Sequence, residues 1–305
     1  MKKIITKGKI KNIVVTTEAL LGLLNIPSDV VKKFLRLGPI LYKDVLISKK
    51  AGKFRPISIP RNDLKSVQKA IVDKMFSRIK LPFCVYGFSK SKTIIENAKY
   101  HAESDFLLNL DIKNFFPSVH FEKIKQMYKD IGCEDALSEI LCKLTTYKYS
   151  LPQGAPTSPF LASLALNNLD NRLMKLAKKN YISYTRYFDD MSFSGSKRVE
   201  KLEQDIVQII LEEGYKINQK RQLFVKGQIK EVNGISIELN GRLFLKNTND
   251  LCSYANDLKE FGFSKLKSNN PEKERLSLLG KINFLKQVDL AKGKDLKVIF
   301  DSIKW

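Results

Sequence analysis

Three aspartates at the ends of apolar segments constrain the fold of this chain more than any other feature. Asp111 follows the mainly apolar run 106–110, and Asp189 and Asp190 stand together at the bend between two alternating segments within 182–194. One aspartate alone is a common turn residue, but carboxylates at the ends of buried strands are costly unless something neutralises them. The adjacent acids at a hairpin tip therefore predict a cation site, and the fold must bring the two strands side by side.

The chemistry of such a site follows from its oxygen ligands. Hard divalent cations prefer carboxylate oxygens and keep positions open for phosphate. Two such ions, about 4 Å apart, clamp the attacking and leaving oxygens of an in-line phosphoryl transfer. We therefore expect Asp111, Asp189 and Asp190 to hold two Mg²⁺ ions, for which Mn²⁺ can substitute. We expect no such role for His101 or His120, because Mg²⁺ favours oxygen over nitrogen.

The charge of the chain indicates a polyanionic partner. Its 305 residues include 54 Lys and Arg against 32 Asp and Glu, a net charge of +22. Most of the excess, +16, falls within residues 1–100, while 101–200 carry +1 and 201–305 carry +5. A high pI can be a device for solubility. The lysines are nevertheless spread over several predicted elements and not along one amphipathic helix, which favours a broad groove for phosphates over a membrane surface.

Composition excludes several other classes of protein. The aliphatic content excludes a disordered chain, and four cysteines without close spacing exclude a disulfide scaffold and a CxxC pair. No apolar run is long enough to span a membrane, and the basic N-terminus lacks the apolar stretch of a signal peptide. We therefore expect a cytoplasmic protein with reduced thiols and no membrane partner.

Hydrophobic periodicity predicts an α+β fold with a mainly antiparallel sheet in its middle. The spacing predicts helices over 17–37 (two short ones), 63–80, 121–144, 158–179 and 202–213, and again near the C-terminus. Thr157 or Ser158 is the expected cap of the 158–179 helix. Alternation and turn residues predict a hairpin over 43–59 and strands at 106–110, 182–194 and 222–245, the last with turns at Asn233-Gly234 and Asn240-Gly241.

Three motifs in order resemble those of reverse transcriptases. The sequence Tyr187-Phe188-Asp189-Asp190 resembles the YxDD box, and the segment from Asp111 to Phe116 (DIKNFF) resembles the first catalytic motif. The segment from Leu151 to Pro159 (LPQGAPTSP) resembles the LPQG…SP motif. A YxDD tetrapeptide alone is weak support, whereas three motifs in the expected order are strong.

Two further motifs are similar to those of bacterial retron reverse transcriptases. The segment 97–101 (NAKYH) matches the NAxxH signature, and Val232-Asn233-Gly234 stands where retron enzymes carry a VTG triplet, with Asn in place of Thr. The resemblance covers about residues 20–290. It implies a right-hand polymerase with fingers, palm and a helical thumb. The implied boundaries are 1–104 for an N-terminal extension and fingers, 105–238 for the palm with a fingers insertion at about 121–155, and 239–305 for the thumb.

The resemblance also implies roles for individual residues. Besides the three metal-binding aspartates, it implies a lysine that protonates the leaving pyrophosphate. Lys220 is the expected lysine, and Lys216 is the competing candidate. Phe116 would be a steric gate against the ribose 2′-OH. The alternative is that Phe115 and Phe116 are core residues, and we expect that one of the two is. The implied nucleotide-binding residues are Lys53, Arg55, Ile112, Phe116, Gln153 and Gly154. The implied RNA or msDNA contacts are Asn97, His101, Val232, Asn233 and Gly234.

The expected function is that of a retron RNA-directed DNA polymerase. Such an enzyme uses dNTPs to copy part of its cognate structured noncoding RNA into branched msDNA, and it primes synthesis from an RNA 2′-OH. Members of the family serve in anti-phage defence together with an effector. We expect the effector here to be a separate polypeptide. One alternative is a group II intron-like or other bacterial reverse transcriptase. A less favoured alternative is a non-catalytic RNA-binding scaffold, against which the intact aspartates argue.

Overall fold

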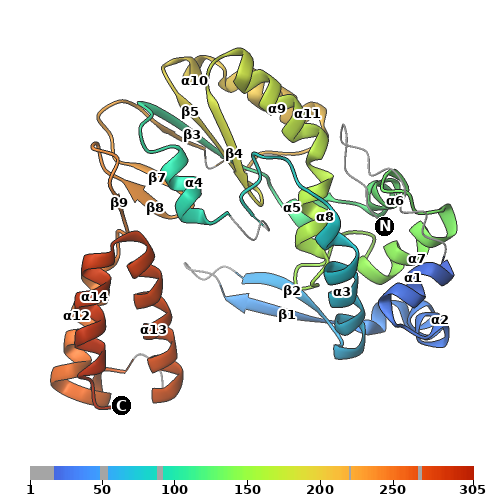
Figure 1. The fold of residues 1–305 in the computed structure, drawn as a ribbon, viewed down its shortest axis with the longest axis horizontal. Helices are drawn as coiled ribbons and strands as arrows, with labels where there is room; N and C mark the ends of the chain where they lie inside the picture. The colour runs from blue at the N-terminus through green and yellow to red at the C-terminus, as the bar shows by residue number, and fades with distance from the viewer. Residues whose placement is uncertain (1–16, 49–53, 88–91, 220, 267–269) are drawn as a thin grey trace. The chain divides into compact units, whose positions relative to one another are not determined.

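A computed structural model describes residues 17–48, 54–87, 92–219, 221–266 and 270–305 of the protein (Figure 1). Its contacts divide the chain into two units, each built from three separate segments. Unit 1 takes in Met1–Lys90, Leu110–Leu176 and Gln204–Lys220, and unit 2 takes in Ser91–Asn109, Ala177–Glu203 and Arg221–Trp305. No helix in the described ranges is both long and apolar enough to cross a membrane.

Unit 1 combines a two-stranded sheet with helices. The predicted hairpin is confirmed as antiparallel strands β1 (Tyr42–Ser48) and β2 (Phe54–Pro60). The helices lie at α1 (Thr17–Leu24), α2 (Ser28–Leu37), α3 (Asn62–Lys74), α5 (Phe115–Ser118), α6 (Phe121–Asp130), α7 (Asp135–Thr145), α8 (Ser158–Ala165) and α11 (Glu203–Glu212), while α9 (Asn167–Lys179) begins here and ends in unit 2. Short 3₁₀ turns follow α2 at Gly38–Leu41 and α3 at Phe76–Arg78.

The core of unit 1 is aromatic and aliphatic. Phe76 stacks on Phe160 with ring centroids 4.5 Å apart, and its other neighbour is the fully buried Tyr128 of α6. Gln68 of α3 is a buried polar residue, and its amide nitrogen donates to the Tyr42 hydroxyl and to the Leu144 carbonyl oxygen, each at 2.8 Å. These bonds join α3 to β1 and α7 while leaving the amide nitrogen paired, as burial requires.

Two helices predicted as continuous are each broken in the structure. The 121–144 helix ends at Asp130 because Gly132 takes a φ of +100° and the Cys133 N–H turns back to the Tyr128 carbonyl oxygen, a glycine-terminated helix end. The 158–179 helix is interrupted at Leu166. The expected hydroxyl cap is also wrong, because Thr157 has helical backbone angles and makes no capping hydrogen bond.

Unit 2 contains the central sheet, except for Leu110 and Asp111 at the end of its first strand, which belong to unit 1. The strands β3 (Phe106–Asp111), β4 (Ser183–Tyr187), β5 (Asp190–Gly195) and β6 (Gln222–Phe224) lie in the order β4-β5-β3-β6. The pairs β4–β5 and β3–β6 are antiparallel. The prediction that the strands carrying the aspartates share a sheet is therefore confirmed, with β3 next to β5.

A second sheet and one helix pack together in unit 2. The three strands β7 (Lys230–Val232), β8 (Ile235–Ile237) and β9 (Leu243–Phe244) form an antiparallel meander. Helix α4 (Ile94–Tyr100) lies against β7 and β8 (Figure 1). Its start has the reciprocal hydrogen bonds of a capping box, between Thr93 and Glu96. The shared core contains Ile95, Ala98, Leu107, Val232, Ile235, Ile237 and Leu243.

The C-terminal helices of unit 2 have a core of their own. Helices α12 (Thr248–Phe261), α13 (Pro271–Val288) and α14 (Leu290–Asp301) pack together, drawn in orange to red in Figure 1. The predicted apolar face of Leu278, Ile282 and Leu285 is buried in this core. Side-chain caps start two of the helices, since Asn270 accepts from the Lys273 N–H and Asp289 from the Lys292 N–H. A short helix, α10 (Arg198–Lys201), and a 3₁₀ turn at Gly262–Lys265 complete the unit.

Candidate active site

The turn between β4 and β5 presents the paired aspartates. Tyr187 pairs with Asp190 across the hairpin, so Phe188 and Asp189 form a two-residue turn. Phe188 has a φ of +56°, which is uncommon for an aromatic residue. The fully buried Arg186 stabilises this turn, because its Nη1 donates to the Phe188 carbonyl oxygen at 2.8 Å. The turn is thus held in a sparsely populated conformation, with Asp189 half-exposed and Asp190 exposed.

The third aspartate, Asp111, is the last residue of β3. Two residues earlier on β3, the Asn109 amide oxygen accepts from the Ser192 hydroxyl of β5 at 2.9 Å. Ser192 itself lies two residues after Asp190. The Asn109 amide nitrogen donates to the Glu231 carbonyl oxygen at 2.7 Å, so this side chain joins β5 to β7 through β3. Such satisfied polar bridges fix the register of neighbouring strands more sharply than apolar contact does.

The chain segment after α11 holds Asp111 from within unit 1. Asn218 donates from its backbone N–H to the Asp111 carbonyl oxygen at 2.8 Å and from its amide to the Asp111 carboxylate. Ile112 forms a β-bridge with Ile217 and is buried, and the Lys113 N–H donates to the Lys216 carbonyl oxygen. Asn218 is a site residue that the sequence motifs do not identify, although it lies between the two candidate lysines, Lys216 and Lys220.

A cavity of about 330 Å³ in unit 1 brings most of the predicted nucleotide-binding residues together. It is lined by Arg55 and Ile57 of β2, by Phe116 of α5, and by the motif residues Gln153, Gly154, Ala155, Pro156 and Pro159. Phe116 is half-exposed in this lining, whereas Phe115 is buried. The structure therefore assigns Phe115 to the core and leaves Phe116 as the candidate gate.

Gly154 allows the motif loop to approach β2 closely. The Ser58 N–H donates to the Gln153 carbonyl oxygen at 2.7 Å. Gly154 has a φ of +127°, and a Cβ at this position would lie 2.8 Å from the Ser58 carbonyl oxygen. Only glycine combines this backbone conformation with this contact.

Two predicted lysines fall outside the described residues. Lys53 lies in 49–53 and Lys220 stands alone between described segments, so their placement is not part of the site described here. The competing candidate Lys216 is exposed, and its backbone oxygen is the acceptor for Lys113.

The expected RNA contacts divide into buried and exposed positions. Asn97, His101 and Val232 are each 0% exposed, so none of these three side chains is open to solvent in this structure. Asn233 is half-exposed and Gly234 exposed. These two form the turn between β7 and β8 with φ values of +50° and +82°, the pattern of a type I′ hairpin turn.

His101 is a neutral, fully paired core residue. Its Nδ1 lies 2.6 Å from the Ser194 hydroxyl and its Nε2 lies 2.7 Å from the Thr185 hydroxyl. Burial, with a smaller contribution from the nearby Lys230 ammonium, lowers the pKa of His101 to about 3. The imidazole is therefore uncharged at neutral pH and offers no cation to a phosphate.

The donor chemistry of the aspartates fits a hard divalent cation. Asp189 and Asp190 are open to solvent, and the Asp111 carboxylate is half-exposed and oriented by the Asn218 amide. Oxygen-only ligands with solvent access suit Mg²⁺, which keeps part of its water shell. Among the residues that the structure describes, no three His, Cys, Asp or Glu side chains converge closely enough to form a metal centre by themselves.

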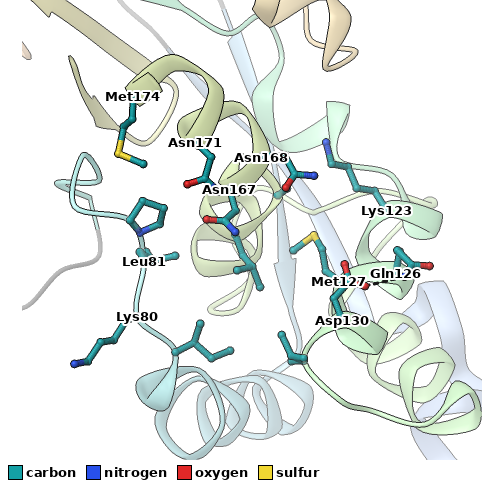
Figure 2. A pocket seen from close by; sticks show the side chains of 15 residues that line it. Lys80, Leu81, Lys123, Gln126, Met127, Asp130, Asn167, Asn168, Asn171 and Met174 are labelled. Carbon is teal, nitrogen blue, oxygen red and sulfur yellow. Dashed lines mark hydrogen bonds between the residues drawn. The ribbon is translucent and has the colours of Figure 1, made fainter. Parts of the chain in front are cut away.

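A larger cavity in unit 1, about 760 Å³, contains none of the predicted site residues (Figure 2). Its wall combines amides of α9 with the apolar side chains of Leu81, Met127 and Met174. Polar groups in this wall pair with protein groups: the Gln126 amide donates to Asp130 at 2.9 Å, and the half-buried Lys123 donates to the Tyr215 hydroxyl at 2.6 Å. The cavity is therefore distinct from the pocket that holds the motif residues.

Comparisons with known proteins agree with the motifs. Residues 47–235 match the family described as reverse transcriptase (RNA-dependent DNA polymerase). The chain is 37% identical over 188 residues to the retron Ec86 reverse transcriptase of Escherichia coli, which covers 59% of this chain and 58% of that protein. It is 28% identical over 232 residues to the retron Mx162 reverse transcriptase of Myxococcus xanthus, covering 66% of this chain and 48% of that protein. The chain thus spans about half the length of these relatives.

Solved structures show the same fold at low identity. A telomerase from Candida tropicalis in complex with a TWJ fragment of telomeric RNA aligns with a TM-score of 0.53 at 12% identity, covering 90% of this chain and 55% of that one. A telomerase from Candida albicans aligns with a TM-score of 0.51 at 11% identity, covering 94% and 61%. The right-hand polymerase fold predicted from the motifs is confirmed. The chain belongs to the reverse transcriptase (RNA-dependent DNA polymerase) family, and the curated relatives it resembles are bacterial retron enzymes.

Proposed function

We propose that this protein is the RNA-directed DNA polymerase of a retron. The observation that carries the proposal is the position of the family's motifs within each unit. Asp111 ends β3, the Asp189-Asp190 turn begins the adjacent strand β5, and the LPQG-type loop lines a nucleotide-sized pocket with Phe116 and Arg55. A scaffold that only binds RNA has no need of these carboxylates or of such a pocket.

The pocket residues have distinct tasks in the proposed reaction. The Arg55 guanidinium binds the triphosphate, for which its planar donors are suited. Gln153 and Gly154 lie along the nucleotide, and Phe116 excludes the ribose 2′-OH by its bulk. Lys53 joins Arg55 on the triphosphate, and the Ile112 carbonyl assists at the metal site. Lys220, with Lys216 as the competing candidate, gives a proton to the departing pyrophosphate.

The carboxylates of Asp111, Asp189 and Asp190 would hold two divalent ions, Mg²⁺ or Mn²⁺. When bound, such ions lower the pKa of a primer hydroxyl and neutralise charge on the phosphates. The protein's own contribution is to orient the carboxylates. The Asn218 amide does this for Asp111, and the Arg186-supported turn does it for the paired acids.

The partners follow from the same proposal. The template is the cognate structured noncoding RNA, the substrates are dNTPs, and the product is branched msDNA primed from an RNA 2′-OH. The excess of +22 supplies the attraction for this RNA. The biological setting is anti-phage defence with a separate effector protein, in the cytoplasm.

The proposed lobes are those implied by the resemblance to the family. Residues 1–104 form the N-terminal extension and fingers, 105–238 the palm with its fingers insertion at about 121–155, and 239–305 the thumb. The separate core of α12, α13 and α14 supports a helical thumb. The central sheet, which carries the aspartate turn on its β4–β5 hairpin, supports the assignment of the palm.

Removal of the paired charges tests the polymerase. Asp189→Asn with Asp190→Asn is expected to abolish Mg²⁺-dependent dNTP incorporation on a primed RNA template while leaving RNA binding within about twofold. Asp205→Asn, an exposed aspartate of α11, is the matched control and should keep full activity. Synthesis that persists in the double variant would sink the site assignment.

Nucleic acid extracted from cells tests the retron assignment. Expression of the chain with its native flanking DNA is expected to yield a short DNA joined to RNA through a 2′,5′ branch, detected by its sensitivity to debranching enzyme. Polymerase activity without any branched product would favour the group II intron-like or other bacterial reverse transcriptase. Binding of RNA without polymerisation would favour the scaffold.

A further inference from the structure

One face of α4 is bonded to the hairpin that carries the paired aspartates. Asn97 and His101 are four residues apart and therefore share a face of the helix, and both are fully buried. The His101 ring bonds Thr185 of β4 through Nε2 and Ser194 of β5 through Nδ1. One side chain thus ties both strands of the hairpin to α4.

The C-terminal end of α4 is fixed by a buried lysine. Lys230 of β7 is 5% exposed, and its ammonium donates to the carbonyl oxygens of His101 at 3.3 Å, Ala102 at 2.7 Å and Ser104. These are carbonyls at and just beyond a helix end, which have no partner within the helix and favour a cation. The helix is therefore anchored at this end to the strand that leads into the Asn233-Gly234 turn.

The other motif residue of α4 reaches the aspartate through that turn. The Asn97 amide nitrogen donates to the Asn233 Oδ1 at 2.7 Å, and the Asn233 Nδ2 donates to the Asp190 Oδ2 at 3.2 Å. The two bonds fix one orientation of the Asn233 amide. The reversed orientation would face one NH₂ group with another and an amide oxygen with a carboxylate, and both contacts are repulsive.

We propose that Asn97 and Asn233 are positioning residues that hold the Asp190 carboxylate in its metal-binding orientation, with His101 and Lys230 anchoring the helix that supports them. This inference rests on the proposed function for the role of Asp190. Under this proposal the NAxxH residues position Asp190 and anchor α4, and they do not contact RNA. It also accounts for Asn in place of Thr in the triplet, because Asn adopts the left-handed backbone at φ +50° while offering both a donor and an acceptor.

Two substitutions at Asn233 distinguish the role of its side chain from the role of its turn backbone. Asn233→Gly deletes the amide and keeps a residue that adopts positive φ, and Asn233→Asp keeps the shape but turns the donor into a second anion facing Asp190. Asn240→Gly is the matched control, because it alters the other Asn-Gly turn, whose side chain accepts only from the Arg242 N–H among the bonds described.

The first measurement is metal binding without turnover. Mn²⁺ is titrated into the full chain and free Mn²⁺ is followed by its EPR signal, with Asp189→Asn/Asp190→Asn defining binding elsewhere on the protein. Asn233→Gly is expected to weaken the Asp-dependent Mn²⁺ binding about three- to tenfold. Asn233→Asp is expected to change the Mn²⁺ affinity by a different factor from Asn233→Gly, because it also adds a negative charge beside Asp190. Asn240→Gly should leave it unchanged, and all variants should keep a melting temperature near that of the parent.

The second measurement is steady-state dNTP incorporation. Loss of positioning is expected to lower kcat about tenfold in Asn233→Gly while the KM for dNTP stays within about twofold, because the nucleotide pocket is untouched. Asn97→Ala should act in the same direction, and the double variant with Asn233→Gly should be no worse than Asn233→Gly alone, since both act through one chain of bonds.

The outcomes distinguish this inference from the proposed function. Unchanged Mn²⁺ binding and kcat in a stably folded Asn233→Gly would overturn the positioning role, as would additive losses in the double variant. No Asp-dependent Mn²⁺ binding in the parent protein would overturn it as well. A parent that binds Mn²⁺ through the aspartates but polymerises nothing would refute the polymerase, and the Mn²⁺ comparison would still decide the positioning role.

Discussion

The Asn233 side chain lies between two residues from distant parts of the chain, donating to Asp190 at 3.2 Å and accepting from Asn97 at 2.7 Å. The amide therefore connects the retron-type NAxxH segment to the aspartate turn through two side-chain hydrogen bonds. Because Asp190 is exposed whereas Asn97 is fully buried, the connection runs from the core of unit 2 to a group that faces solvent. The buried NAxxH segment is thus connected to Asp190 through hydrogen bonds within the protein, without itself contacting substrate.

Phe116 is expected to select deoxynucleotides. Its side chain lines the 330 Å³ pocket beside Gln153 and Gly154, and in the proposed function its bulk excludes the ribose 2′-OH. Phe116→Val should raise the kcat/KM for an rNTP relative to the matching dNTP by at least about tenfold, or about 1.4 kcal/mol in selectivity. Single-nucleotide incorporation with both substrates measures this ratio.

The neighbouring phenylalanine provides the contrast. Phe115 is 2% exposed, so Phe115→Ala should cost about 3–5 kcal/mol of folding free energy without improving use of rNTPs. A Phe116→Val enzyme with unchanged selectivity, or a Phe115 variant that gains rNTP use, would remove the gate from Phe116.

Gly154 is expected to tolerate no side chain. In Gly154→Ala the added Cβ would lie 2.8 Å from the Ser58 carbonyl oxygen at a φ of +127°, so the loop must move away from β2. We expect a loss of about 1–3 kcal/mol in unfolding free energy and a raised KM for dNTP, because Gln153 and Gly154 both line the pocket. Urea unfolding and nucleotide titration measure the two effects.

Gly22 serves as the control for this substitution. It is exposed in α1, and a Cβ there meets nothing within 4 Å. Gly22→Ala should therefore stabilise the protein by about 0.5–1 kcal/mol through helix propensity. If Gly154→Ala were as stable as the parent, with an unchanged KM for dNTP, the close approach of Gly154 to Ser58 would matter neither for folding nor for nucleotide binding.

His101 is expected to make folding stability fall on acidification. Its pKa in the folded protein is lowered to about 3 by burial and by the Lys230 ammonium, whereas an unfolded histidine titrates near pH ~6.5. The folded state resists protonation, so this contribution is complete above about pH 6.5 and is lost progressively as the pH falls toward 3. Between about pH 7 and 5 the parent should lose about 2 kcal/mol from this residue alone.

Comparison with a non-titrating variant isolates that contribution. His101→Gln keeps a donor and an acceptor but does not ionise near neutrality. Urea unfolding at several pH values should show a shallower decline for the variant, since other titrating groups cancel in the difference. Parallel pH profiles for the two proteins would mean that His101 does not resist protonation.

RNA binding is expected to depend steeply on salt. The +22 charge implies many phosphate contacts, and their counterions are released on binding. Affinity for a structured RNA should fall about a thousandfold between about 50 and about 200 mM salt. Fluorescence anisotropy over that range measures the slope, with an uncharged solute at equal osmolality as the control. A flat dependence would contradict the phosphate groove.

The elements around the site were largely predictable because their signals are local. Alternation in 182–194 and the apolar run before Asp111 predicted the strands, and the 43–59 pattern predicted the hairpin β1–β2. Helix ends were less predictable. The break at Gly132 depends on one residue's left-handed backbone and on a returning hydrogen bond to Tyr128, neither of which a hydrophobic pattern reports.

The sequence by itself determined the order of the motifs, the acids at the ends of the two strands and the family to which the chain belongs, because these depend on residue type and spacing. Only the tertiary structure decided that Asn97 and His101 are buried, that Asn218 orients Asp111 and that Asn233 faces Asp190. Each of these contacts joins residues more than a hundred positions apart, or from different secondary-structure elements. Burial and hydrogen-bond partners across such separations depend on packing, which a local sequence pattern does not encode.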